Sequence, residues 1–296
     1  MDKNKFLKRR HIWQAIFAFL QNPKISNIFK GQIYSGAAKK VCVPGLNCYS
    51  CPAAVNACPI GALQSVNGNS KFKFSYYVVG FLIFIGVLFG RLICGFVCPF
   101  GFLQDLIHKI PSPKIKTQKI KFLSYLKYFI LFFVVLLLPI LATNSVGMGE
   151  PFFCKYICPQ GTLEGGVLLS CANKGIRSVL GFLFAFKFII LAGIIIIGIF
   201  IYRPFCKWLC PLGAFYGIFN KFSFYQYHVD KNLCTGCGKC RNLCKMDVDI
   251  TKKPSDGECI RCGKCIAGCK AGAIKHGFNV KDIEKRTQTR YNKTNY

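Results

Sequence analysis

Nineteen cysteines dominate the chemistry that this sequence of 296 residues could perform. They fall in tight local groups beside strongly apolar segments, whereas disulfide scaffolds with many cysteines are short, secreted and rich in loops. Thiolates at close, regular spacing are instead typical of metal ligands. We therefore expect most of these cysteines to bind metal.

Two cysteine runs towards the C-terminal end have the same spacing. Each reads Cys-x2-Cys-x2-Cys-x3-Cys, from Cys234 to Cys244 and from Cys259 to Cys269. This is the spacing of bacterial two-cluster ferredoxins, in which the fourth cysteine of one run ligates the other cluster. One predicted [4Fe–4S] cluster is held by Cys234, Cys237, Cys240 and Cys269. The other is held by Cys259, Cys262, Cys265 and Cys244. Zinc is the alternative, because Cys-x2-Cys pairs also build zinc sites.

A second repeat reads Cys-Pro-x-Gly and occurs four times, beginning at Cys58, Cys98, Cys158 and Cys210. Three of the four have another cysteine four residues upstream, and these are Cys94, Cys154 and Cys206. A proline directly after the cysteine suits the first position of a helix. The thiolate then lies at the positive end of that helix, where backbone N–H groups favour an anionic cluster. We expect these cysteines to be ligand or redox positions.

The elements that must position these motifs are apolar. The chain is 52% hydrophobic with a mean hydropathy of +0.36, which is too apolar for a soluble domain of this length. Three segments are long enough to span a bilayer, and we place them at about 74–93, 127–146 and 179–202. A fourth, at about 12–32, is interrupted by Pro23 and its polar neighbours, so an interfacial amphipathic helix is its alternative.

The predicted fold is therefore an α-helical membrane protein of three or four transmembrane helices with a C-terminal α+β two-cluster ferredoxin-like domain. Residues 1–223 form the membrane domain and residues 224–277 the ferredoxin-like domain. Residues 278–296 form a basic tail that we expect to be disordered.

Loop charges orient the predicted spans. The loop Cys94–Ser124 carries five lysines and the tail after Tyr202 is rich in Lys and Arg, so the positive-inside rule places both in the cytoplasm. We thus expect a multi-pass protein of a bacterial cell membrane with a cytoplasmic ferredoxin-like domain. Basic loops also account for the net charge of +29, and we expect membrane lipid rather than nucleic acid as a partner.

Topology sorts the membrane cysteines into two sites. Four thiolates meet on the cytoplasmic side, close to basic Arg91, Arg203 and Lys207, and they can hold one further [4Fe–4S] cluster: Cys94, Cys98, Cys206 and Cys210. Two reduced thiol pairs are the alternative. The opposite side gathers cysteines that could hold another cluster or a disulfide: Cys48, Cys51, Cys58, Cys154 and Cys158. Cys171 is expected to be a packing residue.

Cys-x3-Cys-Pro motifs at span ends, followed by a ferredoxin module, resemble the polyferredoxin-like 4Fe–4S binding membrane proteins. That family includes the membrane quinol dehydrogenase subunit of periplasmic nitrate reductase, the nitrous oxide reductase regulator and the cytochrome oxidase maturation protein with cupric reductase activity. The resemblance covers about Leu46 to Ile274, and the segment Cys42–Pro52 is similar to a bacterial branch of the family.

The resemblance and the motifs together favour an electron-transfer subunit over a stand-alone enzyme. Electrons would pass between a membrane donor, a quinol of the quinone pool or a flavoprotein, and a redox protein partner. One alternative is a membrane metal-ion (cupric) reductase, with Cys154, Cys158 and Cys171 as metal-handling thiols. Another is a maturation or regulatory factor for an oxidase or reductase that uses the same clusters.

Overall fold

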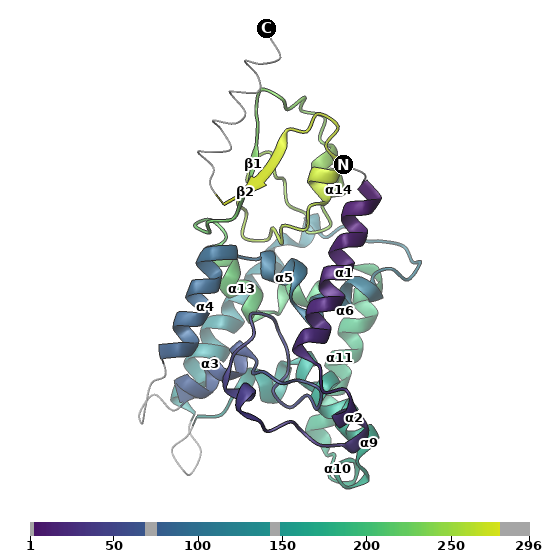
Figure 1. The fold of residues 1–296 in the computed structure, drawn as a ribbon, viewed down its shortest axis with the longest axis vertical. Coiled ribbons are helices and arrows are strands. Elements are labelled where there is room, and N and C mark those ends of the chain that lie inside the picture. Colours follow the sequence, from purple (N-terminus) through teal and green to yellow (C-terminus); the bar gives the residue numbers. More distant parts are fainter. Residues whose placement is uncertain (1–2, 69–75, 143–148, 279–296) are drawn as a thin grey trace.

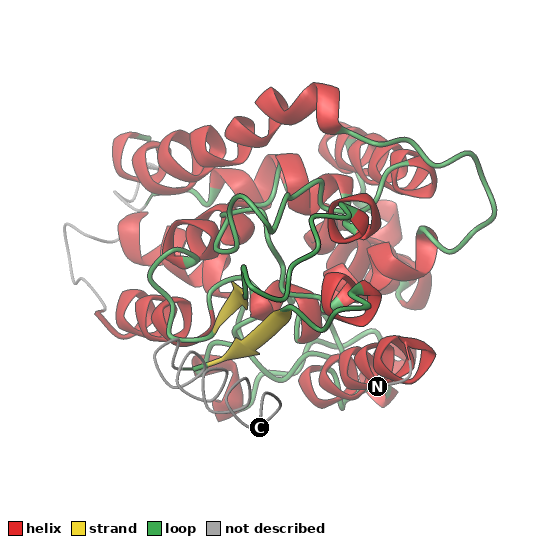
Figure 2. Cartoon of the chain, turned by 90° about the horizontal axis from the view of Figure 1, so that it is seen from above, coloured by secondary structure: helices red, strands yellow, loops and turns green. Residues whose placement is uncertain are grey.

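The computed structural model describes residues 3–68, 76–142 and 149–278. Helices lie along the long axis of the molecule, and a small part with two strands caps one end (Figure 1). In the view along that axis, the strands lie over the helices rather than beside them (Figure 2). The predicted basic tail lies, from residue 279 on, outside the described residues.

Among the described residues, two helices are long and apolar enough to cross a membrane, at Ile120–Leu141 and Phe182–Phe200. The second is α11 (Phe182–Phe200). The first combines the end of η2 (Gln118–Tyr125) with α7 (Leu126–Phe129), the π-helical η3 (Ile130–Leu137) and α8 (Leu138–Leu141). The apolar helix α4 (Tyr76–Phe89) is shorter, because Gly90 turns the chain with a φ of +52° directly after it.

The N-terminal segment differs from the span predicted at 12–32. Helix α1 covers Lys3–Gln21 and a separate short helix, α2, covers Ser26–Lys30. Pro23 lies between them, and a proline lacks the backbone N–H that a continuing helix needs. The predicted segment is therefore not one continuous helix.

The Cys-Pro motifs begin short helices as the sequence predicts. Three of these helices start at the proline itself: α3 (Pro59–Gly68), α6 (Pro99–Ile107) and α13 (Pro211–Phe219). In the fourth motif, helical residues start at Pro159 and continue as η5 (Gly161–Val167). The upstream cysteines lie on three further short helices: α5 (Leu92–Phe96), η4 (Phe153–Ile157) and α12 (Pro204–Trp208). The chain is thus mostly helical.

The capping part, from β1 to β2 (residues 226–277), contains two copies of one turn–helix unit. Strand β1 (Gln226–Val229) pairs antiparallel with β2 (Ile274–Gly277), with Gln226 opposite Gly277. Helix α14 (Lys239–Leu243) follows Gly238 at a φ of +65°, and α15 (Lys264–Gly268) follows Gly263 at +77°. The two helices pack against each other, and both end at the fourth cysteine of a run.

The remaining helices complete the end of the molecule farthest from the strands (Figure 1). There α9 (Leu168–Ala172) packs against α2 and against α10 (Lys174–Ser178). The 3₁₀ turn η1 (Ala37–Lys40) belongs to the long connection between α2 and α3. Cys171 on α9 is exposed, so its prediction as a packing residue is wrong; the buried residue of this helix is Leu169.

Candidate metal centres

One group of four cysteines lies in the helical core beneath the strands. We call Cys94, Cys98, Cys206 and Cys210 the proximal group; each is only 5–7% exposed. Burial and repulsion from the other three sulfurs raise the pKa of Cys210 well above its usual value. The Gly213 N–H donates to the Cys210 sulfur at 3.3 Å, and Gln104 Nε2 donates to the Cys206 sulfur at 3.2 Å. The structure thus brings together the four cysteines that the sequence assigned to one site.

Two arginines surround the proximal group with positive charge. Arg91 precedes Cys94 by three residues and Arg203 precedes Cys206 by three, and both side chains are fully buried. Arg203 forms a bidentate ion pair with Asp105, which also pairs with Arg10. Burial opposes the ionisation of Asp105, but the two guanidinium groups hold its pKa far below its usual value. Four thiolates or an anionic cluster would be stabilised by this arrangement.

A second group lies farther from the strands. The electrostatic contacts of the buried Cys158 sulfur define it, and we call Cys48, Cys58, Cys154 and Cys158 the distal group. Gln64 Nε2 donates to the Cys154 sulfur at 3.2 Å, and the Gly161 N–H donates to the Cys158 sulfur at 3.5 Å. Of the five cysteines predicted here, Cys51 is not among the electrostatic contacts of Cys158: its sulfur hydrogen-bonds to Asn22 Oδ1, and it packs with Ala53 and Ala54 beside Cys48.

The distal group opens onto a cavity of about 590 Å³. Glycines form part of its wall, because a Cβ atom at Gly61 would lie 3.7 Å from the Cys154 sulfur and one at Gly161 would lie 3.7 Å from the Cys48 sulfur. Glu164 accepts a hydrogen bond from the Cys48 N–H at 2.9 Å. Burial raises the pKa of Glu164 to about 7. The cavity therefore has room beside the sulfurs and little fixed negative charge.

The two groups are built alike. In each, a glutamine six residues after a Cys-Pro cysteine donates to the sulfur of a cysteine from a different motif: Gln64 to Cys154 and Gln104 to Cys206. Each group also has a glycine N–H that donates to the cysteine three residues before it. Because N–H donors stabilise the negative charge of a thiolate or a cluster, both groups fit the same kind of ligand.

The capping part holds eight further cysteines. Cys244 joins the second run, and four sulfurs interact there electrostatically: Cys244, Cys259, Cys262 and Cys265. They line a small cavity with Tyr227. From the other set, Cys240 interacts with Cys234, and Cys269 packs with Cys240 beside Ile274. Cys237 is exposed, so the set that contains Cys237 lies at the surface. The set that contains Cys244 faces the helices.

Buried polar contacts join the capping part to the proximal group. Arg91 donates to Gly257 O and Glu258 at 2.8 Å, and Lys127 also pairs with Glu258. Burial opposes the ionisation of Glu258, but these two cations hold its pKa below its usual value. Asn220 donates to Cys259 O at 2.9 Å and accepts from the Arg91 N–H at 3.1 Å.

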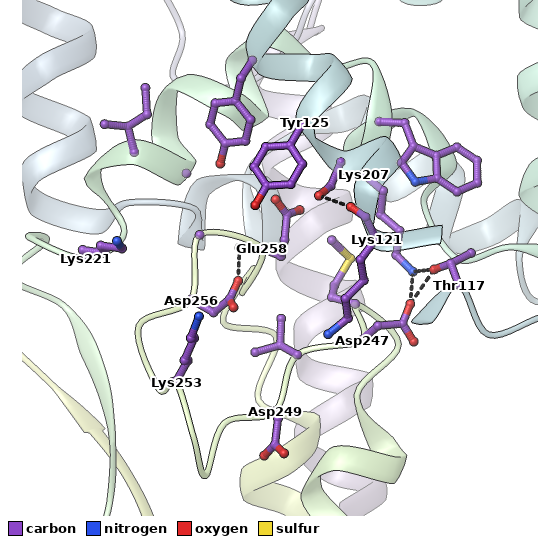
Figure 3. Close-up of a pocket in the computed structure, with 18 of the residues that line it drawn as sticks. Thr117, Lys121, Tyr125, Lys207, Lys221, Asp247, Asp249, Lys253, Asp256 and Glu258 are labelled. Carbon is purple, nitrogen blue, oxygen red and sulfur yellow. Dashed lines mark hydrogen bonds and ion pairs between the residues drawn. The ribbon is translucent and has the colours of Figure 1, made fainter. Parts of the chain in front are cut away.

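A further contact closes one side of the same junction. Lys207 donates to Thr117 and Asp247, and these three side chains meet beside a cavity of about 680 Å³ (Figure 3). Lys121 and Tyr125 of η2 border this cavity from the helical part, and residues 246–249 and 256–258 border it from the capping part. The capping part is thus held on the helices by ion pairs from Arg91, Lys127 and Lys207.

The state of the sulfurs fits ligation. All nineteen cysteines are free thiols, so the disulfide considered for the distal site is not formed in this structure. Burial raises the pKa of Cys98 to about 12 and that of Cys259 to about 12, so these thiols hold protons until a metal replaces them. Among the described residues, no three His, Cys, Asp or Glu side chains converge closely enough to hold a single metal ion. In a cubane, by contrast, each thiolate binds a different iron.

Comparison with known proteins identifies the chemistry. Three parts of the chain, residues 74–118, 128–169 and 183–225, match a family model described as a 4Fe–4S binding domain. Two uncharacterized proteins of Methanocaldococcus jannaschii are 31% and 30% identical to it, over 69% and 68% of this chain and 71% and 77% of their own. The chain belongs to the polyferredoxin-like family of 4Fe–4S binding proteins.

Within this family, the ferredoxin-type protein NapH of Haemophilus influenzae is 25% identical over 66% of this chain and 64% of its own length. No solved structure matches the chain. Each matched segment contains one Cys-x3-Cys-Pro motif, from Cys94, Cys154 or Cys206, so the family signature lies in the helical part. Binding of 4Fe–4S clusters is what the family model gives to this chain.

Several features around the cysteine groups were not found by reasoning from the sequence. Gln64 and Gln104 stand at the same position of two Cys-Pro motifs, which is a signal that could have revealed their role. Arg261 has a φ of +51° at the position that Gly236 takes in the other run, and it donates to Phe89 O and Asn220 O. Nothing local in the sequence predicts that Arg261 reaches the helical part.

Proposed function

We propose that this protein is a membrane-bound electron-transfer protein that passes electrons between a membrane donor, a quinol or a flavoprotein, and a redox partner. One observation carries the proposal. A single guanidinium, that of Arg91, hydrogen-bonds to Cys206 O in the proximal group and to Gly257 O, two residues before Cys259. Cysteines of the helical part and of the capping part are thereby held next to each other.

The proposed cofactors are four [4Fe–4S] clusters. Two belong to the ferredoxin-like domain, residues 224–277, with Cys244 and Cys269 exchanged between the runs. One belongs to the proximal group and one to the distal group of the membrane domain, residues 1–223. When bound, such clusters supply one-electron redox chemistry, and the chain supplies spacing, N–H donors and nearby positive charge.

N–H groups that donate to a cysteine sulfur support this assignment at three of the four proposed cluster sites. The Val248 N–H donates to the Cys244 sulfur at 3.4 Å in the ferredoxin-like part, and the glycine and glutamine donors do the same in the two membrane groups. Hydrogen bonds to the sulfurs raise a reduction potential because they stabilise the reduced, more negative state.

Exposed apolar faces support a membrane location. On the helix ending at Leu141, large side chains face outward, including Phe129, Phe132 and Leu141. On α11, Phe182 is 87% exposed and Ile189 is 69% exposed. Apolar surface of this extent marks contact with lipid or another protein. We propose three or four spans, with the ferredoxin-like domain and the proximal group on the cytoplasmic side. A cytoplasm-specific fluorescent reporter fused after Tyr296 should be bright, and darkness would overturn this orientation.

Metal analysis tests the cluster assignment. Anaerobically purified protein should contain iron and sulfide in equal amounts, and EPR should show [4Fe–4S] signals on reduction. Replacing both Cys94 and Cys206 by alanine should remove about four irons per chain. The control is Cys171→Ala, which changes an exposed cysteine outside all groups. Unchanged iron in the double variant, or zinc as the only metal in the wild type, would disprove the proposal.

A further inference from the structure

The surface over one cysteine set of the capping part is open. We call residues 231–243 together with residues 269–272 the outer face, because they surround the set that contains Cys237. The Cys237 side chain is itself exposed. A Cβ atom added at Gly236 or at Gly238 would meet nothing within 4 Å. A second molecule can therefore approach this cysteine set closely.

The two stretches of the outer face are neighbours in space. Helix α14 belongs to the first stretch and packs against α15, which ends directly before the second stretch. A Cβ atom at Gly268 of α15 would meet the Leu243 side chain of α14. Cys240 of the first stretch and Cys269 of the second also pack against the same small apolar core. The residues of both stretches thus form one continuous surface.

Every charged side chain of the outer face is positive and exposed. These side chains are Lys231, Lys239, Arg241 and Lys270. Among the described residues, only Arg241 of these four pairs with a carboxylate, at 3.8 Å from Asp249 and with 55% of its side chain exposed. The carboxylates of the capping part are buried or half-buried: Asp230, Asp247, Asp249, Asp256 and Glu258. The outer face thus presents positive charge to solvent that the chain itself largely leaves unpaired.

Two apolar side chains lie among these charges. Leu233 is 38% exposed and Leu243 is 40% exposed. Apolar residues inside a polar, charged rim are typical of protein–protein interfaces. Electron-transfer complexes lie at the small end of the range of interface sizes, so a patch of a few residues is sufficient for docking. The charged rim then raises the rate at which a partner of opposite charge is encountered.

We propose that the outer face is the docking site for an acidic protein that carries single electrons. The inference rests on the proposed function, because it needs a cluster held by the cysteines of this set. One electron passes between that cluster and the redox group of the partner; one is oxidised as the other is reduced, and no further reagent takes part. Negative charge on the partner complements the four cations and directs it to the exposed Cys237.

An anionic lipid surface fits the outer face less well. The outer face belongs to the capping part, whereas the helices with exposed apolar sides lie beyond the junction with that part (Figure 1). A bilayer around those helices leaves the outer face in water. A soluble protein is therefore the partner that both the charge and the position of the outer face favour.

Charge reversal on the outer face tests the docking site. The probe is an oxidised acidic flavodoxin, and stopped-flow absorbance follows its reduction by the full chain, reduced beforehand and held in nanodiscs of neutral lipid. The variant Lys231→Glu, Lys270→Glu should lower the second-order rate constant about tenfold at low salt, and high salt should slow the wild type in the same way. The matched control is Lys30→Glu, Lys174→Glu. It makes the same change in net charge on exposed lysines of α2 and α10, at the far end of the molecule, and should leave the rate nearly unchanged (Figure 1).

A basic electron carrier separates docking from a change in reduction potential. With cationic cytochrome c as the probe, the outer-face variant should react faster than the wild type, because repulsion is removed. A shift in the potential of the cluster would instead change the rates with both probes in the same direction. Iron content and EPR establish that the variant keeps its clusters. Should it lose them, Lys231→Glu alone takes its place, since Lys231 is exposed and three residues from Cys234.

The two probes also separate the docking site from the proposed function. If iron-loaded wild type reduces flavodoxin at a rate that neither the outer-face variant nor salt changes, or if the variant slows both probes equally, the docking site is wrong although the proposed function stands. If the reduced wild type passes no electron to either probe, the proposed function itself fails. Vesicles of anionic phosphatidylglycerol that bind the wild type but not the variant, with equal flavodoxin rates for both, would show that the outer face contacts lipid and would overturn the proposal.

Discussion

Arg91 and Arg203 each hydrogen-bond to the backbone of the other's cysteine motif. Arg91 Nη2 donates to Cys206 O at 3.0 Å, and Arg203 Nη1 donates to Cys94 O at 2.5 Å. Both arginines precede their own first cysteine by three residues. The two motifs are thus locked together reciprocally, and the lock places two buried positive charges beside four sulfurs.

Replacing Arg91 by methionine should remove half of this lock. We expect a lower reduction potential for the proximal cluster, because a positive charge beside the reduced cluster is lost. Glu258 would keep only Lys127, and breaking a buried ion pair costs about 3 kcal/mol of folding stability. EPR redox titration and thermal unfolding measure the two effects. Lys155→Met is the control: its pair with Glu150 is solvent-exposed and should leave stability nearly unchanged. Equal potentials in Arg91→Met and wild type would contradict the prediction.

The two glutamines should tune one cluster each. Gln104→Leu removes the donor to the Cys206 sulfur, and Gln64→Leu removes the donor to the Cys154 sulfur, with little change in volume. We expect the first variant to lower only the potential of the proximal cluster and the second to lower only that of the distal cluster. Each variant is the control for the other, with iron content as the check on folding. A shift of the same signal in both variants would show that the glutamines do not act locally.

Arg261→Gly should weaken the junction between the two parts of the chain. Glycine suits the φ of +51° better than arginine does, so any loss comes from the missing hydrogen bonds to Phe89 O, Asn220 O and Ser223 Oγ. We expect faster proteolysis between Ser223 and Gln226 and slower electron transfer from the proximal cluster to the ferredoxin-like domain. Arg241→Ala, at a largely exposed pair with Asp249, should leave both unchanged. Wild-type proteolysis in Arg261→Gly would show that the junction does not depend on this side chain.

The cysteine motifs predicted more than the apolar segments did. Spacing and predicted topology together placed Cys94 and Cys206 in one group, because a Cys-x3-Cys-Pro unit fixes its own helix and sulfur positions locally. The span predicted at 12–32 was too long. Hydropathy is averaged over a window that includes Pro23, but the helix ends before this proline. The close approach of Gly45 to Cys98 could not be predicted, because it joins residues far apart in sequence. The hydrogen bonds of side-chain donors such as Asn220 could not be predicted from the sequence for the same reason.

Exchange of the fourth ligand between the cysteine runs gives the last prediction. In the structure Cys244, from the first run, faces Cys262 of the second, so Cys244→Ala should damage the cluster that faces the helices. Cys269→Ala should instead damage the cluster of Cys234, Cys237 and Cys240. Because only the first of these clusters adjoins Arg91 and Asn220, Cys244→Ala should block electron transfer from the proximal group to the ferredoxin-like domain. Cys269→Ala should leave that first transfer intact and block only the step beyond it. EPR of each variant, combined with rapid-freeze reduction through the membrane part, separates the two cases. The opposite pattern, with Cys269→Ala blocking the first transfer, would mean that each run keeps its own fourth cysteine.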